Sequence, residues 1–436
     1  MMNAFSFKSF LVRLKLLTFI ALRNIWRNPV RSILTISGLA GGLIMVILYS
    51  ALMEGMKLQM VQQATEISTG HIQIHRNSYI EDQDLYSTLS WTYLNAFDNK
   101  FKPINAAPHL YAAGLASTKN SSTGVLIKAV DPAREVKTSS ALNHVRQGIM
   151  DLTSTSKTPE GLIIFPVMVG SQLAQNHHIK PGDELILVTQ AADGSIGNAI
   201  YRVSGIFKPL DPNFDRTGVL MSIEAYQQLM YLEDGFHELV IRLDDASSLN
   251  ETQDLIETFN LSFITKTAEG QDRMVVRNWQ QLAPSLASML EMSKSMVWII
   301  GLIVVGLASL GAMNTMLMAV FERTHEFGIL LSIGMKPYWI LTMVLLESLF
   351  LGLFASVLGS ILGVILVWYF QLNPIDFSNL MPEGFDWGGI LFEPTLAMHL
   401  EPEYIYQGSI LLIAVTLIAS LVPSWKTVHL KPAEAL

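Results

Sequence analysis

The stretch MVWIIGLIVVGLASLGAMNTMLMAV, residues 296–320, contains no charged side chain. An α-helix of about 20 apolar residues crosses the hydrocarbon core of a bilayer, so this stretch predicts a membrane-spanning helix. Three more stretches have the same character, residues 30–53, 338–370 and 405–425, and together they contain only two charged side chains. We therefore predict an α-helical membrane protein with four transmembrane helices.

The composition agrees with a membrane protein that also has a sizeable soluble part. Of the 436 residues, 50% are hydrophobic and 15% are charged, whereas about 25% of an ordinary soluble chain is charged. The formal charge of −8 argues against nucleic acid as a partner, because such binding needs a basic surface. The absence of cysteine excludes disulfides, thiolate nucleophiles and cysteine-ligated zinc.

The placement of charge predicts how the chain crosses the membrane. Residues 1–53 contain six Lys or Arg and no acid, whereas residues 371–404 contain six Asp or Glu and no Lys or Arg. Short loops rich in Lys and Arg stay in the cytoplasm. We therefore expect a protein of the inner (cytoplasmic) membrane, with both termini and residues 321–337 in the cytoplasm and residues 54–295 on the far side.

The insertion between the first two predicted helices is large and combines strand-like alternation with helical patches, so we expect an α+β domain there. Residues 8–27 place apolar side chains three and four residues apart among basic ones. This pattern predicts an amphipathic helix in the plane of the membrane, and a basic segment that only sets topology is the alternative. The expected segments are a cytoplasmic lead-in 1–29, transmembrane helices 30–53, 296–320, 338–370 and 405–425, an external domain 54–295, a cytoplasmic helix 321–337, an external loop 371–404 and a cytoplasmic tail 426–436.

The sequence contains no evident motif for catalysis or metal binding. It lacks the P-loop pattern GxxxxGK[ST], the HExxH pattern and the GxSxG pattern. His71 and His75 lie four residues apart in a strand-like segment, and we interpret them as a solvated polar face because a zinc site needs at least a third ligand. We therefore expect no catalytic residue, no metal and no cofactor in this chain.

The most informative motif is the predicted cytoplasmic segment FERTHEFGILLSIGMKP, residues 321–337. Glu322 and Glu326 lie one helical turn apart with Arg323 beside them, apolar residues follow, and Gly334 is placed to end a helix. A short amphipathic helix of this kind can dock in a groove of a partner, with its charged end fixing the register. A solvated connector between two transmembrane helices is the alternative that these residues leave open.

Two polar side chains lie within the predicted spans, Asn314 and Glu347. An intramembrane acid is by default a functional residue. Glu347 lies only about 14 Å along its helix from Tyr338, and no partner charge is evident in the spans. We therefore expect Glu347 to brace the bundle near the cytoplasmic face rather than to bind a proton or a substrate. Glycine pairs at residues 38/42 and 359/363 permit close helix packing, within one bundle or with a partner.

The cytoplasmic motif also resembles a known signature. The pattern ERTxExGILxxIG over residues 322–334 looks like that of the FtsX/MacB/LolC-E superfamily of ABC transporter permeases. The resemblance extends from about residue 20 to the end of the chain, and it is most specific in the C-terminal half. Further similar segments are residues 23–32, 170–174, 181–183, 203–207 and 431–436.

The resemblance implies a mechanotransmitting permease rather than an enzyme. In this family two permeases, identical or related, pair with two copies of a separate ATPase, which binds ATP and Mg²⁺. It implies that residues 54–295 form a MacB-like periplasmic core domain, and that membrane lipids, lipoproteins or a periplasmic protein are further partners. The residues that it implies for coupling to the ATPase are Glu322, Arg323, Glu326, Gly328 and Gly334.

The order of segments is closest to that of the lipoprotein-releasing permeases: one span, a large external domain, three spans and no fused ATPase. The first hypothesis is therefore extraction of lipoproteins from the outer leaflet of the inner membrane for delivery to an outer membrane. Two alternatives stay open, efflux of a peptide, toxin or drug from the periplasm with an adaptor, and ATPase-driven control of an extracellular hydrolase. Residues 190–199 are short and lack proline and large aromatics, which argues against direct recruitment of a chaperone by this chain.

Methionines gather where the first and second predicted spans leave the membrane on the far side. Met53, Met56, Met292 and Met296 lie at these ends. Methionine is unbranched and polarizable, which suits surfaces that accept varied apolar shapes. We expect a substrate to enter from the outer leaflet at this point, and plain apolar packing between two long helices is the alternative.

Overall fold

The computed structural model describes residues 2–428 apart from short internal gaps, and it divides into two compact units. The helical unit comprises residues 1–58, 289–382 and 394–436, and the α+β unit comprises residues 59–288 and 383–393. Most of the predicted cytoplasmic tail therefore lies outside the described residues. The gaps are residues 83–85, 103, 119–120, 140–144, 158–160, 162, 209–211, 233, 245–247, 268–273, 381–384, 388–389 and 393.

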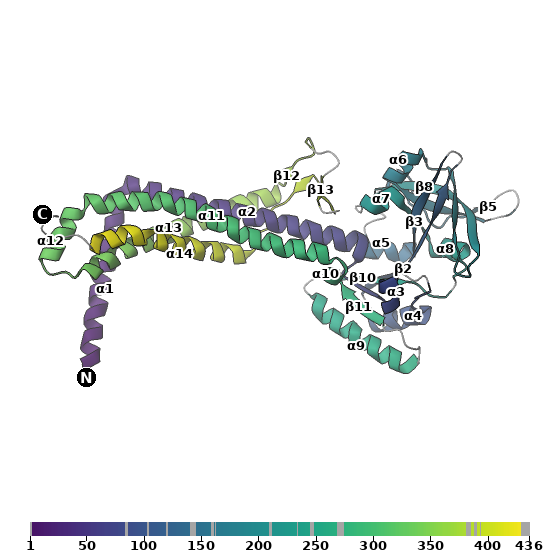
Figure 1. Cartoon of the computed structure of the whole chain (residues 1–436), viewed down its shortest axis with the longest axis horizontal. Helices are drawn as coiled ribbons and strands as arrows, with labels where there is room; N and C mark the ends of the chain where they lie inside the picture. The colour runs from purple at the N-terminus through teal and green to yellow at the C-terminus, as the bar shows by residue number, and fades with distance from the viewer. Residues whose placement is uncertain are drawn as a thin grey trace. The chain divides into compact units, whose positions relative to one another are not determined.

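In the described part of the chain, four helices are long and apolar enough to cross a membrane, and they run side by side (Figure 1). Each begins at a proline, which suits the first helical turn because the N–H that proline lacks has no partner there. The 39 residues of the second rise about 58 Å, well beyond a ~30 Å hydrocarbon core. The four helices are α2 (Pro29–Gln63), α11 (Pro284–Glu322), α13 (Pro337–Leu372) and α14 (Pro402–Val428).

Two of these helices continue past the boundaries that we predicted for the external domain. α2 runs on beyond residue 53, and α11 begins well before residue 296. The charged residues in these extensions, among them Glu54 and Lys294, do not end a helix, because only glycine and proline strongly oppose one. The predicted boundaries are therefore the ends of apolar stretches rather than the ends of helices.

Small residues bring the long helices close together within the helical unit. A Cβ atom added to Gly363 of α13 would lie 2.9 Å from Ile47 of α2, and one added to Gly42 of α2 would lie 2.9 Å from Ala308 of α11. A larger side chain at either glycine would require a shift of the neighbouring helix. Packing inside one bundle accounts for these two glycines, whereas a Cβ on Gly38 would meet no described atom within 4 Å.

Helix α1 (Met2–Arg27) packs on the helical unit with one side of its second half. The apolar stripe that predicted an in-plane helix faces the protein there, because its members contact α11, α13 and the short helix α12 (Thr324–Ser332). Another side of α1 is open, and Trp26 is 74% exposed on it. The buried residues of the stripe are Leu17, Ala21 and Ile25.

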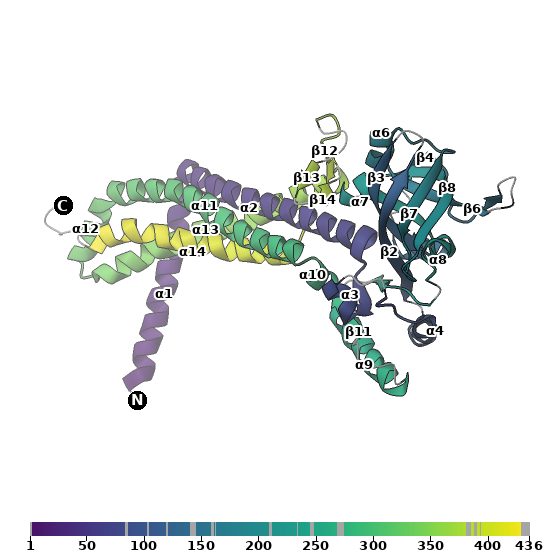
Figure 2. The ribbon, with the colours of Figure 1, turned by 45° about the vertical axis from the view of Figure 1, so that its right-hand side comes forward.

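Six strands of the α+β unit close into a barrel (Figure 2). β2 (Asn105–Ser117) pairs with β3, β3 with β9, β9 with β6, β6 with β8, β8 with β7, and β7 returns to the second half of β2. Closure provides hydrogen-bond partners on both sides of each strand. The other five strands are β3 (Ser122–Val130), β6 (Ile163–Gly170), β7 (Glu184–Gln190), β8 (Ile196–Phe207) and β9 (Gly218–Ser222).

The first half of β2 carries the sheet beyond the barrel to β10 (Glu238–Arg242), β1 (Ile72–Arg76) and β11 (Met274–Asn278). Alternate residues of the strands point inward and form one large apolar core. The remaining described elements are η1 (Ala64–Thr69), α3 (Asn77–Asp82), α4 (Trp91–Lys100), α5 (Pro132–Thr138), α6 (Ser171–His177), α7 (Pro212–Thr217), α8 (Ile223–Met230), α9 (Leu249–Thr267), α10 (Trp279–Leu282), β4 (Val145–Gly148), β5 (Ser156–Lys157), β12 (Ile375–Asp376), β13 (Phe385–Trp387), β14 (Ile390–Phe392) and β15 (Thr395–Leu396).

The histidines at the first strand do not form a solvated face. His71 is 9% exposed and His75 is 2% exposed. β1 lies between β10 and β11 in the sheet, which makes it an interior strand. The prediction of a polar outer face is therefore wrong. Among the residues that the structure describes, no group of three or more His, Cys, Asp or Glu could hold a metal ion.

Candidate functional site

The short helix α12 lies between the long helices α11 and α13 in the segment that carries the sequence signature. Its end is fixed by backbone geometry. Gly334 has a φ of +94°, its N–H donates to Leu331 O at 3.0 Å, and the N–H of Met335 donates to Leu330 O at 3.0 Å. This is the Schellman motif, in which a residue with positive φ satisfies the last carbonyls of a helix.

One face of α12 is held against the helical unit by apolar contacts. Phe327 and Gly328 are buried. Phe327 belongs to a cluster with Leu17 of α1 and with Trp339 and Ile340 of α13. These contacts fix the position of α12 against α1 and α13. A movement of α12 would therefore disturb this shared core.

Charged side chains tie the same helices together, in a series that we call the arginine–glutamate chain. Arg27 Nη1 of α1 lies 2.9 Å from Glu326 Oε1 of α12. Arg323 Nε lies 3.0 Å from Glu326 Oε2, and Arg323 Nη1 lies 3.2 Å from Glu347 Oε2 of α13. The chain thus runs Arg27–Glu326–Arg323–Glu347 and links α1, α12 and α13.

Arg323 is the central member of this chain. Its side chain is 11% exposed and that of Glu347 is 18% exposed, and its guanidinium lies 5.2 Å from the centre of the Phe327 ring. The view that Glu347 has no charged partner is therefore wrong. Burial alone would raise the pKa of Glu326, but hydrogen bonds from Arg323 and Arg27 hold this pKa below its usual value.

A separate ion pair joins α2 to the end of α11. Arg31 Nη2 lies 2.6 Å from Glu322 Oε1. Three of the residues predicted to couple to an ATPase, Glu322, Arg323 and Glu326, are thus all paired inside this chain. Of the two polar residues predicted within the spans, Asn314 is exposed on α11. The other, Glu347, makes the ion pair with Arg323 described above.

The outward side of the segment carries a different set of residues, which we call the outer stripe. Phe321 is 54% exposed, Ile329 is 40% exposed and Ile333 is 78% exposed, and His325 is also exposed. The four positions are spaced four residues apart: Phe321 lies at the end of α11, His325 and Ile329 lie in α12, and Ile333 follows the end of α12. Sequence reasoning selected the charges and missed this stripe, although its spacing was visible.

A second group of charges, which we call the histidine cluster, lies inside the α+β unit. His109 Nε2 lies 2.7 Å from Glu135 Oε2, and His109 Nδ1 lies 3.2 Å from Glu238 Oε1. Lys128 Nζ lies 3.6 Å from Glu135 Oε1, and the Tyr111 hydroxyl donates to Glu238 at 2.8 Å. Ionised carboxylates only accept hydrogen bonds, so a protonated His109 can donate to both from its two ring nitrogens.

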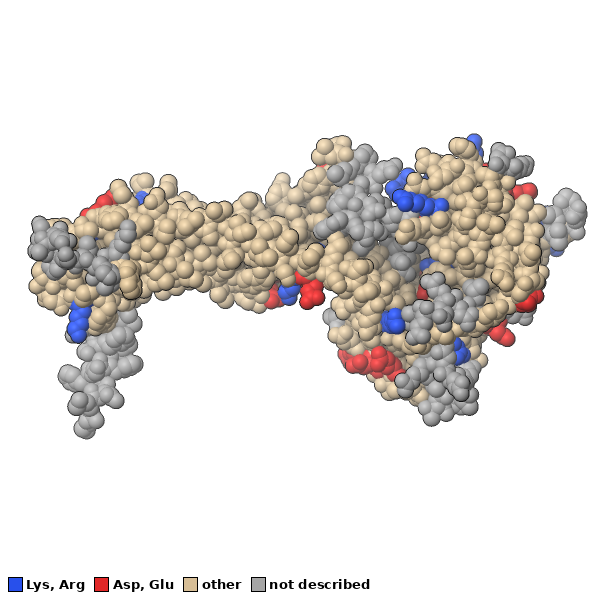
Figure 3. All heavy atoms as spheres, viewed as in Figure 1, with Lys and Arg blue, Asp and Glu red and all other residues tan. Residues whose placement is uncertain are grey.

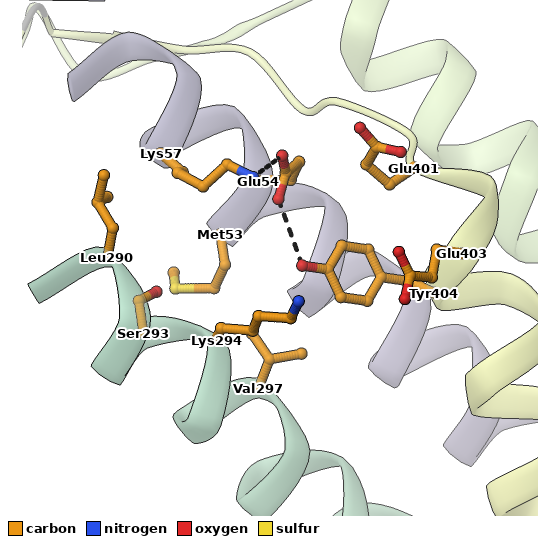
Figure 4. Close-up of a pocket in the computed structure, with 10 residues that line it drawn as sticks. All are labelled: Met53, Glu54, Lys57, Leu290, Ser293, Lys294, Val297, Glu401, Glu403 and Tyr404. Carbon is orange, nitrogen blue, oxygen red and sulfur yellow. Dashed lines mark hydrogen bonds and ion pairs between the residues drawn. The ribbon is translucent and has the colours of Figure 1, made fainter. Parts of the chain in front are cut away.

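At the other end of the long helices, α2, α11 and α14 surround a cavity of about 190 Å³ (Figure 4). Of the four methionines predicted to line a substrate entrance, only Met53 lines this cavity. Met292 is 63% exposed and Met296 is 49% exposed, so packing within this chain does not account for them. The cavity is lined by Met53, Glu54, Lys57, Leu290, Ser293, Lys294, Val297, Glu401, Glu403 and Tyr404.

Comparison with known proteins adds to this geometry. The family model described as the FtsX-like permease C-terminal matches residues 298–432, and the MacB-like periplasmic core domain matches residues 32–259. The lipoprotein-releasing system transmembrane protein LolC of Neisseria meningitidis serogroup B is 23% identical over 427 residues, which cover 94% of this chain and 95% of that protein.

Two other relatives differ in how much of their length is matched. LolE of Haemophilus influenzae is 24% identical, with 72% of each chain covered. The macrolide export ATP-binding/permease protein MacB of Nitrobacter winogradskyi is 22% identical over 94% of this chain but only 58% of its own length. Together with the four apolar helices, these matches place the chain in the FtsX/MacB/LolC-E superfamily of ABC transporter permeases.

Proposed function

We propose that this chain is the permease subunit of a transporter that extracts lipoproteins from the outer leaflet of the inner membrane for delivery to an outer membrane. It would work with a separate ATPase, which binds ATP and Mg²⁺, and with a second permease that is identical or related. The near full-length match to a lipoprotein-releasing protein supports this choice. This chain would need no cofactor of its own.

The orientation of the proposed subunit follows the charge pattern. The basic N-terminal segment, α12 and the C-terminus would lie in the cytoplasm, because Lys and Arg are retained there. The α+β unit would lie in the periplasm, in agreement with the description of the family model that matches it.

The observation that carries the mechanism is that α12 is tethered on its inner side. The arginine–glutamate chain and the Phe327 cluster fasten α12 to α1 and α13. The outer stripe is left exposed for the ATPase, and an exposed apolar helix face suits a groove on a partner. When the ATPase changes shape, α12 would move and pull α1 and α13 with it.

Substitution of the outer stripe tests this mechanism. We expect Ile333→Asp to abolish copurification of the ATPase and its stimulation, because a charge would enter an apolar contact. Ile196→Asp is a matched control, since Ile196 in the α+β unit is also 78% exposed. Both variants should keep the melting temperature of the wild type. Undiminished ATPase stimulation in Ile333→Asp would contradict the docking role.

The substrate is tested separately in proteoliposomes that contain this chain, the ATPase and a fluorescent acylated lipoprotein. We expect ATP-dependent release of the lipoprotein to an acceptor chaperone. Photo-crosslinkers at Met53, Met56, Met292 and Met296 should capture the acylated end if these residues line the substrate entrance. Absence of release, together with protection of cells against a macrolide, would favour the efflux function named for the MacB relatives.

A further inference from the structure

One wall of the cavity between α2, α11 and α14 is polar, and its buried carboxylate is paired with neighbouring side chains. Glu54 is 3% exposed, it pairs with Lys57, and the Tyr404 hydroxyl donates to Glu54 Oε2 at 3.3 Å. A carboxylate this deeply buried needs such partners. This triad therefore forms one wall, in which the buried Glu54 carboxylate already has its partners.

Two opposite charges of the lining remain without a partner. Neither the Lys294 ammonium nor the Glu401 carboxylate makes an ion pair or a hydrogen bond with another described residue. Lys294 comes from α11 and Glu401 from the residue before α14, so they approach the cavity from different elements (Figure 4). The cavity thus offers one free cation and one free anion among its described side chains.

The chain before α14 is held firmly, which fixes Glu401 in place. His399 N–H donates to Ala51 O of α2 at 3.0 Å, and the Ala397 carbonyl lies directly against Gly55. Any side chain larger than hydrogen at residue 55 would collide with that carbonyl. The glycine therefore brings the segment that carries Glu401 onto α2 beside the cavity.

Next to the polar cavity lies an apolar slot between the same three helices. The two spaces share Val297 and Tyr404. Two glycines line the slot, Gly301 of α11 and Gly408 of α14. A Cβ atom added to Gly408 would lie 3.1 Å from Leu43 of α2, so the helices pack closely there. The slot has a volume of only about 20 Å³, so it offers the polar chamber an apolar border rather than a channel for a whole acyl chain. The slot is lined by Val46, Ser50, Val297, Trp298, Gly301, Tyr404, Gln407, Gly408 and Leu411.

The cavity also lies at the depth where lipid headgroups are found. Arg31 and Glu54 are the charges at either end of the apolar part of α2, and at 1.5 Å per residue they are about 35 Å apart. This distance slightly exceeds a hydrocarbon core of about 30 Å. Figure 3 shows the same feature as an uncharged length of surface on the helical unit between two charged zones.

We propose that this cavity binds the headgroup of a zwitterionic phospholipid that carries a primary amine, with the apolar slot beside the start of its acyl chains. The phosphate would lie at Lys294 and the ammonium at Glu401. A volume of 190 Å³ holds about six water molecules at 30 Å³ each, which suits a small headgroup and excludes a folded peptide. The site would be a resident lipid site, and it does not depend on which substrate the transporter moves.

The charges of the lining favour this headgroup over others. An anionic headgroup would bring negative charge to a cavity that has three carboxylates, Glu54, Glu401 and Glu403, against two lysines. The acylated end of a lipoprotein has no phosphate to pair with Lys294. A headgroup with a quaternary ammonium cannot donate a hydrogen bond to Glu401, whereas a primary ammonium can.

Native mass spectrometry of the full-length chain tests the proposal. The purified protein is exchanged into an equimolar mixture of phosphatidylethanolamine, phosphatidylcholine and phosphatidylglycerol, and the retained lipid is counted. We expect phosphatidylethanolamine to be retained at least fivefold over either other lipid. Lys294→Gln and Glu401→Gln should each reduce this preference to less than twofold, because each removes one of the two paired charges.

Matched variants separate the site from general charge effects. Glu291→Gln changes an acid of α11 that does not line the cavity, and it should leave the preference unchanged. Gly301→Leu should lower retention of the diacyl lipid by filling the slot, and an unchanged melting temperature would show that the variant is folded. Equal retention of all three lipids by the wild type would overturn the proposal. Insensitivity of the preference to both Lys294→Gln and Glu401→Gln would also overturn it.

Discussion

The arginine–glutamate chain of the helical unit and the histidine cluster of the α+β unit use similar groups in different settings. The histidine cluster lies within a sheet and the helix beside it, and the side chains of His109 and Glu135 are each 1% exposed. The arginine–glutamate chain joins three separate helices, and its outer members Arg27 and Glu326 are 48% and 45% exposed. One set of charges is sealed in a core, whereas the other has a mostly buried central pair, Arg323 and Glu347, and exposed outer members.

This difference indicates different roles. Pairs exposed to water are weak and can exchange partners at little cost, whereas breaking a buried pair leaves a charge without compensation. The histidine cluster is therefore suited to keeping the α+β unit rigid. The arginine–glutamate chain is suited to helices that shift against one another during a transport cycle.

The largest expected effect comes from breaking the histidine cluster. Glu135→Gln removes the carboxylate that faces both His109 and Lys128, and it should destabilise the α+β unit by about 3–5 kcal/mol. Hydrogen exchange of β2 and β10 amides in the full chain would measure this loss. Asp254→Asn in α9 is the control, because Asp254 is exposed. An equal loss of stability in this variant would show that burial of the histidine cluster does not matter.

The pH dependence of the same cluster should give a smaller effect. Burial opposes a charged imidazole, but Glu135 and Glu238 hold the pKa of His109 above its usual 6.5. The stabilisation is therefore complete below pH 6.5 and is lost as the pH rises through the folded-state pKa. The loss is smaller than that of Glu135→Gln, because a neutral imidazole still donates one hydrogen bond.

At acid pH the stability changes with pH in the opposite direction. Burial opposes a carboxylate, but His109 and Lys128 lower the pKa of Glu135 from 4.5 to about 2, so its stabilisation is lost as the pH falls from about 4.5 towards 2. Hydrogen exchange of β2 across both ranges would check these directions. A flat profile above pH 6.5 would show that His109 is not held as an imidazolium.

A still smaller effect is expected at the centre of the arginine–glutamate chain. Arg323→Gln leaves Glu347 without its partner and should destabilise the helical unit by about 1–3 kcal/mol. Glu326 keeps Arg27, which limits the loss. The double variant Arg323→Gln with Glu347→Gln should recover part of the stability in a thermal melt. Strictly additive losses would show that the two side chains do not interact.

The smallest effect is expected at the pair between Arg31 and Glu322. Glu322→Gln removes a single exposed ion pair, and such pairs contribute little and are screened by salt. We expect a thermal melt close to that of the wild type, and any difference should vanish in high salt. A loss of thermal stability as large as that of Arg323→Gln would show that this pair contributes as much as the pair between Arg323 and Glu347.

The sequence was sufficient to predict the four long apolar helices, because uncharged stretches such as residues 296–320 have few other stable structures. The end of α12 was also predictable, since Gly334 is a common residue at a position with positive φ. The direction in which Glu322 and Glu326 point could not be predicted from the sequence. Helical spacing places the two on one face, but it does not say whether that face meets this chain or a partner.

The barrel and the histidine cluster were beyond sequence reasoning for a related cause. Strand alternation predicts which residues share a face, but not which strands become neighbours. His71 and His75 have the pattern of a half-exposed strand, yet they are only 9% and 2% exposed, because burial depends on what packs over that face of the sheet and the alternation does not show this. Likewise, nothing local connects His109 with Glu238, which lies directly opposite it on another strand.

The uncharged length of α2 between Arg31 and Glu54 has a mechanical consequence. A span of about 35 Å in a core of about 30 Å is mismatched, and tilting relieves the mismatch at a cost of fractions of a kcal/mol per Å. A thinner bilayer would tilt the bundle further, and a thicker one would straighten it. Bilayer thickness therefore acts as a load on the helix bundle, which includes α13, and the arginine–glutamate chain ties α13 to α12.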